Sequence, residues 1–309
     1  MDHFFTEEEQ MIQETARQLA QEKIVPVRQG LDERDEFPRE IMETMGKSDL
    51  MGIYIPEEYG GLELGSLAMC IAIEEISRAC VGVSTAYAAN ALGTYPFLLY
   101  GTDEQKKKYL PAIASGKMLV GFGLTEANAG SDASGIQTTA KLDGDHYVLN
   151  GTKQWITNGG EADLYTIIAI TDRNKGARGA SAFIVEKNAP GFSCGKKEEK
   201  MGIRCSATTE LIMEDCRIPK ENIIGRQGMG FIVAMKTLDK ARVGVGAQGV
   251  GVAQGAIDEA ISYARNRIQF GQPVVAFQAV QHMLADMATQ TEAARTLVYA
   301  AARYIDTGA

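Results

Sequence analysis

The segment Phe122–Asp132, with the sequence FGLTEANAGSD, is the stretch whose residue types could most directly support chemistry. It follows a short apolar run and brings Gly, Ala, Ser and Thr together in a polar turn. Backbone N–H groups in such a turn are free to bind a planar heterocycle or a phosphate. Taken alone, the segment is more simply a polar connection that leaves a strand.

A second segment, Gly151–Asn158, contains the only tryptophan of the chain. If this segment forms a strand, Trp155 and Thr157 point to the same face. An indole beside a hydroxyl could cover an aromatic cofactor and donate a hydrogen bond to it. A single tryptophan is also typical of a hydrophobic core, so a second observation is needed to choose between the two.

A third motif, Gly244-Val-Gly-Ala-Gln-Gly249, matches the G-x-G-x-x-G fingerprint of dinucleotide-binding folds. That fingerprint requires a preceding strand, a following helix and an acidic residue about 20 positions further on. Residues 231–242 instead have helical periodicity, and there is no carboxylate around Gln269 and Phe270. We therefore expect these glycines to be packing positions in a helix. The motif therefore gives little support to a third hypothesis for the function, a nicotinamide-dependent dehydrogenase.

The elements that position these motifs change along the chain. Residues 1–118 predict an N-terminal α-helical domain. Thr6 and Glu9 form a capping box ahead of apolar residues at helical spacing. We expect Ser66 to cap a further helix in the same domain.

Residues 119–225 predict a middle antiparallel β domain, since most of their apolar runs are β-branched or aromatic. Asp143-Gly144 and Asn150-Gly151 are both typical of tight hairpin turns. We expect these two turns to join three short strands into a meander.

Residues 226–309 predict a partial C-terminal α-helical domain, with helices over about 229–266 and 276–304. The second of these helices carries an apolar stripe of eight residues. Burying one large apolar side chain is worth about 1.5–3 kcal/mol, so an uncovered stripe would be a serious liability. We expect that another subunit covers it or that the natural chain continues past Ala309. The fold class is therefore multi-domain α and β, with an incomplete C-terminal helical bundle.

Composition excludes several classes of protein. The 309 residues carry a net charge of −9, which argues against a nucleic-acid groove. The longest uncharged run, residues 79–102, contains Ser, Thr, Asn, Gly and Pro, so we expect no membrane span. The N-terminus has neither a basic region nor an apolar region of the signal-peptide type, so we expect no signal peptide. Five widely spaced cysteines and scattered histidines predict neither a disulfide framework nor a metal site, and favour a cytoplasmic protein.

Several segments in one order resemble the acyl-CoA dehydrogenase family of flavoproteins. They are Ile53–Gly61, Phe122–Asp132, Trp155–Thr157, Met201–Arg204 with Ser206, and Arg267–Gly271. Several independent motifs in the right order are far more specific than any single one. The resemblance implies a helical N-terminal domain, a middle β domain and a C-terminal bundle, usually assembled as a homotetramer.

The resemblance also implies FAD as cofactor, bound between the β domain and the C-terminal bundle. Phe122, Leu124 and Thr125 would line the flavin. Trp155 and Thr157 would lie at the ring near its hydride-accepting nitrogen. The resemblance also implies an acyl-CoA substrate and an electron-transfer flavoprotein as partner, with no nucleic acid and no membrane.

Further roles follow from the resemblance, residue by residue. Ser131 would contact both FAD and the CoA thioester. Asp239 and Arg242 match a CoA-contacting Asp-x-x-Arg; the alternative is an exposed (i, i+3) ion pair, worth only about 0.2–0.5 kcal/mol. The residues that would hold the FAD of a neighbouring subunit are Arg267, Phe270 and Gln278.

In this family a proton leaves the α carbon of an acyl thioester while hydride leaves the β carbon for the flavin. The reaction needs a general base. The chain lacks the family's C-terminal Tyr-Glu-Gly-Thr segment, and Ala241 occupies the alternative position of the glutamate. We therefore expect the glutamate that acts as the general base to lie beyond Ala309. A non-catalytic flavin- and acyl-CoA-binding subunit of an electron-transfer assembly is the alternative.

By the same resemblance, the helix over about 85–99 approaches the acyl chain. It contains no Arg or Lys, so a glutaryl-type substrate with a free carboxylate is disfavoured. Its small residues could leave room for a bulky, branched or alicyclic acyl group, although small residues also serve helix packing. They are Ala86, Ala88, Ala89, Ala91 and Gly93.

Overall fold

The computed structural model describes residues 5–307 and divides into two compact units. Unit 1 combines Met1–Gln29, Leu64–Ser84 and Arg242–Ala309, and unit 2 combines Gly30–Glu63 and Thr85–Ala241. Three of the four boundaries fall inside helices, and these three helices therefore belong to both units. These are α2 (Arg28–Glu33), α5 (Val81–Tyr100) and α7 (Gly230–Asn266).

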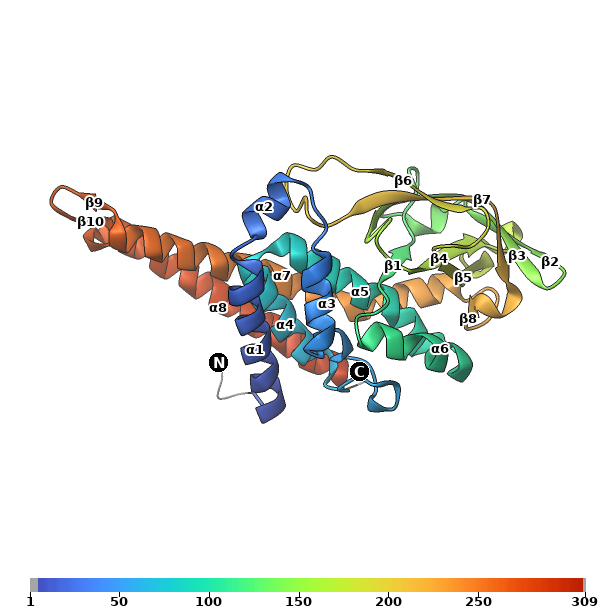
Figure 1. Ribbon diagram of the computed structural model, residues 1–309, viewed down its shortest axis with the longest axis horizontal. Coiled ribbons are helices and arrows are strands. Elements are labelled where there is room, and N and C mark those ends of the chain that lie inside the picture. The colour runs from blue at the N-terminus through green and yellow to red at the C-terminus, as the bar shows by residue number, and fades with distance from the viewer. Residues whose placement is uncertain (1–4, 308–309) are drawn as a thin grey trace. The chain divides into compact units, whose positions relative to one another are not determined.

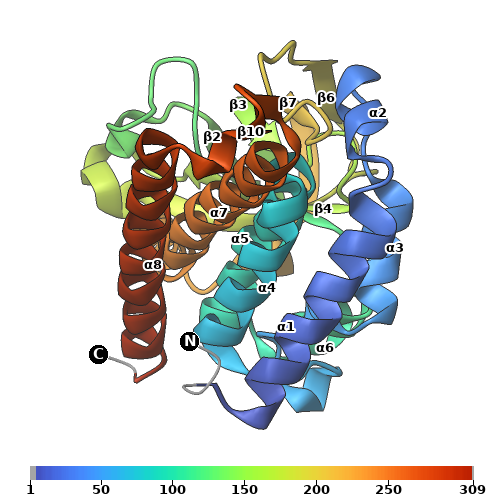
Figure 2. The ribbon, with the colours of Figure 1, turned by 90° about the vertical axis from the view of Figure 1, so that its left-hand side faces the viewer.

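Unit 1 is helical. Its own elements are α1 (Glu7–Leu19), a π-helical turn (Ala20–Ile24), α4 (Gly65–Ala79), α8 (Gln278–Asp306) and the small hairpin β9 (Ile268–Gln269) with β10 (Gln272–Pro273). Helices α1 and α4 lie side by side (Figure 2). The capping box at the start of α1 is confirmed, since the Glu9 amide donates to Thr6 Oγ1 at 3.2 Å and the Thr6 amide to Glu9 Oε2 at 2.9 Å.

The start of α4 differs from our prediction. Ser66 lies inside α4 and does not cap it; the capping position is Leu64, which makes no side-chain hydrogen bond. Instead, the Ser66 amide donates to both carboxylate oxygens of Asp306 at 2.9 Å. An acceptor from the far end of α8 thus replaces the local hydroxyl that the sequence pattern favoured.

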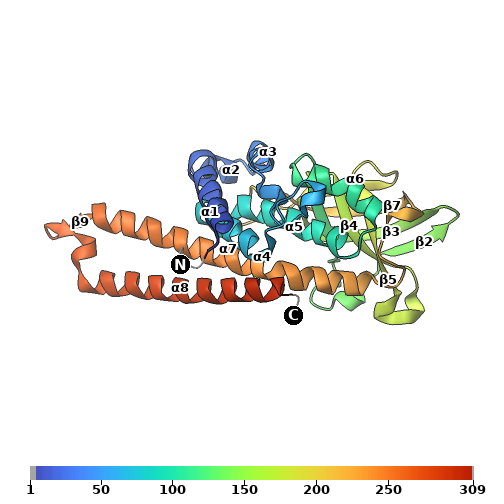
Figure 3. The same cartoon turned by 90° about the horizontal axis from the view of Figure 1, so that it is seen from below.

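The glycine-rich part of α7 is helical throughout, so it has no strand–turn–helix. Its glycines allow close packing, as expected. A Cβ at Gly251 would lie 2.4 Å from the Glu74 carbonyl oxygen, and one at Gly255 would lie 2.4 Å from the Arg78 carbonyl oxygen, both on α4. The part of α7 that belongs to unit 1 runs alongside α8 (Figure 3).

Unit 2 contains the β domain together with α3 (Arg39–Lys47) and α6 (Asp103–Ala114). Its eight-stranded sheet has the order β6-β7-β3-β2-β4-β5-β8, and the eighth strand, β1, pairs with β4 outside this path. The strands are labelled in Figure 1. The strands are β1 (Val120–Gly123), β2 (Thr139–Asp143), β3 (His146–Thr157), β4 (Leu164–Ile170), β5 (Ala180–Glu186), β6 (Phe192–Lys197), β7 (Thr208–Pro219) and β8 (Ile223–Ile224). The predicted fold class is confirmed.

Two details of the sheet were not predicted correctly. The turn at Asp143-Gly144 is present, because β2 pairs with β3 up to Asp143 and His146. Asn150-Gly151, however, is not a turn: β3 runs straight through it, with a shift of register against β7. In addition, β1 pairs with β4 in parallel, so the mostly antiparallel sheet is mixed.

Within residues 5–307, no helix is long and apolar enough to cross a bilayer. Over the same range, no group of His, Cys, Asp or Glu side chains is arranged to hold a metal ion. All five cysteines are free thiols.

Candidate functional site

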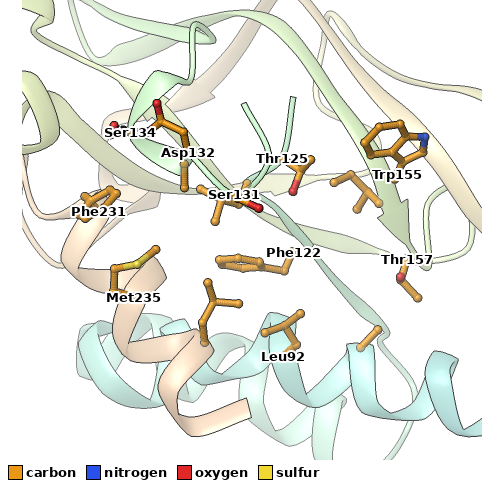
Figure 4. A pocket seen from close by; sticks show the side chains of 16 residues that line it. Leu92, Phe122, Thr125, Ser131, Asp132, Ser134, Trp155, Thr157, Phe231 and Met235 are labelled. Atoms are coloured by element: carbon orange, nitrogen blue, oxygen red, sulfur yellow. Dashed lines mark hydrogen bonds between the residues drawn. The ribbon is translucent and has the colours of Figure 1, made fainter. Parts of the chain in front are cut away.

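The candidate site is a cavity of about 490 Å³ within unit 2, close in size to typical small-molecule sites. It is lined by side chains from β1 and the segment that follows it, from the end of β3, and from helices α5 and α7 (Figure 4). The lining residues are Ala89, Leu92, Phe122, Leu124, Thr125, Gly130, Ser131, Asp132, Ala133, Ser134, Trp155, Ile156, Thr157, Phe231, Met235 and Leu238. They include all the β-domain residues that we expected to bind FAD, namely Phe122, Leu124, Thr125, Ser131, Trp155 and Thr157.

One wall of the pocket is the segment that follows β1. The backbone of this segment is fixed to β3, because the Gln154 amide donates to the Thr125 carbonyl oxygen at 2.8 Å. Glu126 and Ala129 then exchange two backbone hydrogen bonds, at 3.1 and 3.0 Å, which fold the chain back. Ser131 follows directly and reaches the same cavity as Thr125.

The facing wall is the end of β3, where Trp155 has a left-handed backbone with φ of 56°. Against β7, Lys153 pairs with Leu211 and Ile156 with Thr209, so β3 carries one extra residue between them. This bulge changes the alternation of the strand. Trp155 is 58% exposed as a result, and it lines the pocket together with Thr157, as expected.

The polar groups of the pocket are available to a ligand. The hydroxyls of Thr125, Ser131 and Thr157 make no hydrogen bond within the part of the chain that the structure describes. Asp132 is the one carboxylate among the described lining residues, and its Oδ1 accepts a hydrogen bond from Ser134 Oγ at 2.6 Å. The site can therefore offer three hydroxyls and an exposed indole to a bound molecule.

The remaining side of the pocket is apolar. Ala89 and Leu92 of α5 contribute to it, as the expected approach of that helix to the acyl group requires. Phe231, Met235 and Leu238 of α7 were not predicted. Their spacing of four and three residues puts them on one helical face, and this is the sequence feature that could have identified them.

Five predicted residues do not line this pocket. Asp239 follows Leu238 on α7 in unit 2. The other four, which belong to unit 1, are Arg242, Arg267, Phe270 and Gln278. Phe270 lies at the tip of the β9–β10 hairpin, where it is 93% exposed.

Three family models match the chain in succession. They are described as the N-terminal, middle and C-terminal domains of acyl-CoA dehydrogenase and match residues 6–117, 121–216 and 228–309. The chain belongs to the acyl-CoA dehydrogenase family. It is thus a member of a family of oxidoreductase flavoenzymes that depend on FAD.

Individual members of the family agree closely with the chain. The probable acyl-CoA dehydrogenase FadE25 of Mycobacterium bovis is 48% identical over 98% of this chain and 78% of its own length. The butyryl-CoA dehydrogenase structure from Megasphaera elsdenii is 42% identical, with a TM-score of 0.96 over 98% of this chain and 81% of that one. A chain in the structure described as the electron transferring flavoprotein of Acidaminococcus fermentans is 48% identical, with a TM-score of 0.97 over 100% and 81%.

FAD is present in a further acyl-CoA dehydrogenase structure, from Bacillus anthracis. That protein is 41% identical, with a TM-score of 0.89 over 96% of this chain and 50% of that one. Ala309, after which the catalytic glutamate is expected, lies outside the residues that the structure describes.

Proposed function

We propose that this protein catalyses the FAD-dependent α,β-dehydrogenation of an acyl-CoA thioester to the 2-enoyl-CoA. The observation that carries the proposal is the pocket of unit 2, in which Thr125, Ser131, Trp155 and Thr157 meet around one cavity. When bound there, FAD supplies the acceptor for the hydride of the β carbon. The unengaged hydroxyls and the exposed indole fit a planar, polar-edged ring system.

Each wall has its own task in the proposal. Phe122 and Leu124 exclude water from the cavity, and Thr125 and Thr157 offer hydroxyls to the flavin edge. Trp155 covers the ring. Ser131 is proposed to contact both the cofactor and the thioester end of the substrate.

The CoA portion of the substrate is proposed to lie beyond this cavity, along α7. Asp239 and Arg242 are the residues assigned to it. Support comes from their place on α7, shortly after the lining residues Met235 and Leu238.

The acyl group is proposed to be uncharged. No lysine or arginine lines the pocket among the described residues, so the carboxylate of a glutaryl-type substrate would have no counter-ion. Ala89 of α5 leaves space in the same wall, which favours a branched or alicyclic acyl group over a dicarboxylic one.

The general base is proposed to be a glutamate outside these 309 residues. The carboxylate of Asp132 is already engaged by Ser134. If no such glutamate exists, the alternative is a subunit that binds flavin and acyl-CoA without catalysis.

The protein is further proposed to act as a cytoplasmic homotetramer that passes electrons to an electron-transfer flavoprotein. Arg267, Phe270 and Gln278 would hold the FAD of a neighbouring copy. The almost fully exposed Phe270 supports this, since a large exposed aromatic side chain favours contact with another molecule. The proposed domain division is 1–118, 119–225 and 226–309, and the three family matches fall within these ranges.

Anaerobic addition of acyl-CoA to the protein as its gene encodes it tests the proposal. An enzyme bleaches the visible absorbance of the flavin, whereas a binding protein only shifts it. Butyryl-, isobutyryl-, cyclohexanecarboxyl- and glutaryl-CoA form the substrate panel. A protein that purifies colourless and takes up no added FAD would refute the proposal.

A further inference from the structure

A buried ion pair lies behind the wall of the proposed FAD site. Lys153 Nζ is 2.7 Å from Glu126 Oε1, and the two side chains are only 0% and 10% exposed. The lysine stem passes beneath β1, where a Cβ at Gly123 would lie 3.4 Å from Lys153 Cγ. Removing two charges from water is unfavourable, so such a pair is weak evidence for stability as such. Its hydrogen bonds indicate another role.

The pair fastens both ends of the pocket segment 124–138. At the first end, Lys153 Nζ donates to the Leu124 carbonyl oxygen at 3.0 Å. At the second end, the Glu126 carboxylate accepts the amides of Gln137 at 2.6 Å and Thr138 at 3.0 Å. The residues between these ends include Gly130–Ser134, which line the cavity.

The electrostatics are those of a tightly held pair. Burial lowers the pKa of Lys153 to about 8, although the charge of Glu126 opposes the shift. A neutral or a charged amine can still donate to both the Leu124 carbonyl and the carboxylate. The geometry of the segment is therefore held on either side of this pKa.

We propose that Lys153 and Glu126 are positioning residues for FAD, which shape the 124–138 segment before the cofactor binds. The inference rests on the proposed function. If this wall is already ordered, no conformational entropy is lost in ordering a loop when FAD binds. The affinity for FAD is therefore higher. Neither side chain is among the residues that line the cavity, so both would act through Thr125 and the 130–134 segment.

The test measures FAD binding in Lys153→Met, in Glu126→Gln and in the double variant that carries both substitutions. Each is compared with Lys141→Met. Lys141 is an exposed lysine of β2 and serves as the matched control. FAD release from the holoprotein on dilution is followed by the recovery of flavin fluorescence. We expect each single variant to bind FAD about tenfold more weakly. The double variant should lose much less than the product of the two losses, because the residues act as a unit.

A spectroscopic readout separates positioning from a merely structural role. The visible circular dichroism of the bound flavin should change in Lys153→Met and stay unchanged in Lys141→Met. Variants with a lower unfolding midpoint but wild-type FAD affinity and flavin spectrum would overturn the proposal. Wild-type protein that binds no FAD would instead refute the proposed function.

If the variants fail to fold, hydrogen exchange of the wild-type protein after removal of FAD still tests whether the segment is ordered before the cofactor binds. Hydrogen exchange at the Gln137 and Thr138 amides should be as slow as in the neighbouring strand β2, because the buried Glu126 carboxylate accepts both. Rapid exchange at these two amides would overturn the proposal.

Discussion

Lys153 and Trp155 stand two positions apart on β3 and differ completely in exposure: the lysine is fully buried, and the indole is 58% exposed. In a regular strand both would share one face and one environment. The extra residue between Lys153 and Ile156 separates them. This one bulge in β3 therefore places the Trp155 indole at the pocket and the Lys153 ammonium group behind the pocket wall.

FAD binding should quench the fluorescence of Trp155, since it is the only tryptophan of the chain and lines the pocket. Replacing Trp155 by Leu should weaken FAD binding roughly two- to tenfold, because an aromatic contact is worth about 0.5–1.5 kcal/mol. Titration followed by tryptophan emission measures the first effect. Titration followed by flavin fluorescence measures the second, because the Trp155→Leu variant contains no tryptophan. Saturable FAD binding with no change in tryptophan emission would place the cofactor elsewhere.

Enlarging Ala89 should change substrate preference. In Ala89→Leu we expect turnover of cyclohexanecarboxyl-CoA to fall about tenfold or more, while turnover of butyryl-CoA changes much less, because the added side chain fills acyl space. The control is Ala88→Leu, at a neighbouring residue that does not line the pocket. Equal losses for both thioesters would show that Ala89 does not face the acyl group.

Two glycines of α7 should respond oppositely to alanine. Gly251→Ala puts a Cβ 2.4 Å from the Glu74 carbonyl oxygen, so we expect a loss of about 1–3 kcal/mol in the free energy of unfolding. Gly249 has nothing within 4 Å of its Cβ position, so Gly249→Ala should stabilise the helix by up to about 1 kcal/mol. Denaturant titration compares the two. A neutral Gly251→Ala would contradict close packing against α4.

Acid should reduce the contribution of the Glu126 carboxylate to the stability of the fold. Burial alone raises the pKa of Glu126, but Lys153 and the hydrogen bonds from Lys153, Thr138 and Gln137 outweigh it and bring the pKa below the usual 4.5. The contribution of the carboxylate is therefore complete above pH 4.5 and is lost as the pH falls through the folded-state pKa.

Comparison of the wild type with Glu126→Gln isolates this titration. Near neutral pH the wild type should be more stable by about 1.5–3 kcal/mol, the usual contribution of hydrogen bonds to a charged group. The difference should shrink once the pH is below 4.5. A gap that stays constant under acid would show that the charge of Glu126 contributes nothing. Denaturant titration over a pH series provides the measurement.

The sequence predicted those parts of the fold that depend on neighbouring residues. The capping box at Thr6 and the turn at Asp143-Gly144 are local, and both are present. Asn150-Gly151 has the same turn composition but lies within β3, because β7 pairs with residues on both sides of it. Ser66 was misjudged for a similar reason: the group that caps α4 is Asp306, 240 positions away.

The residues of the candidate site also fall into those that the sequence predicted and those that it did not. The motif residues Thr125, Ser131, Trp155 and Thr157 meet as expected, because each lies in a short segment of distinctive composition. The face of α7 that completes the pocket consists of ordinary apolar residues. Nothing in their types distinguishes a cavity from a core, so only the tertiary arrangement could assign them.

Unit 1 is assembled from three segments that are far apart in the chain, and the amide of Ser66 donates to the carboxylate of Asp306, 240 positions further along. On the ribosome, α1 and α4 can pack against each other early, but the face of α4 that packs on α7 and α8 stays uncovered until those two helices have been made. Protection of this face of α4 during translation is a demand that this topology places on the cell.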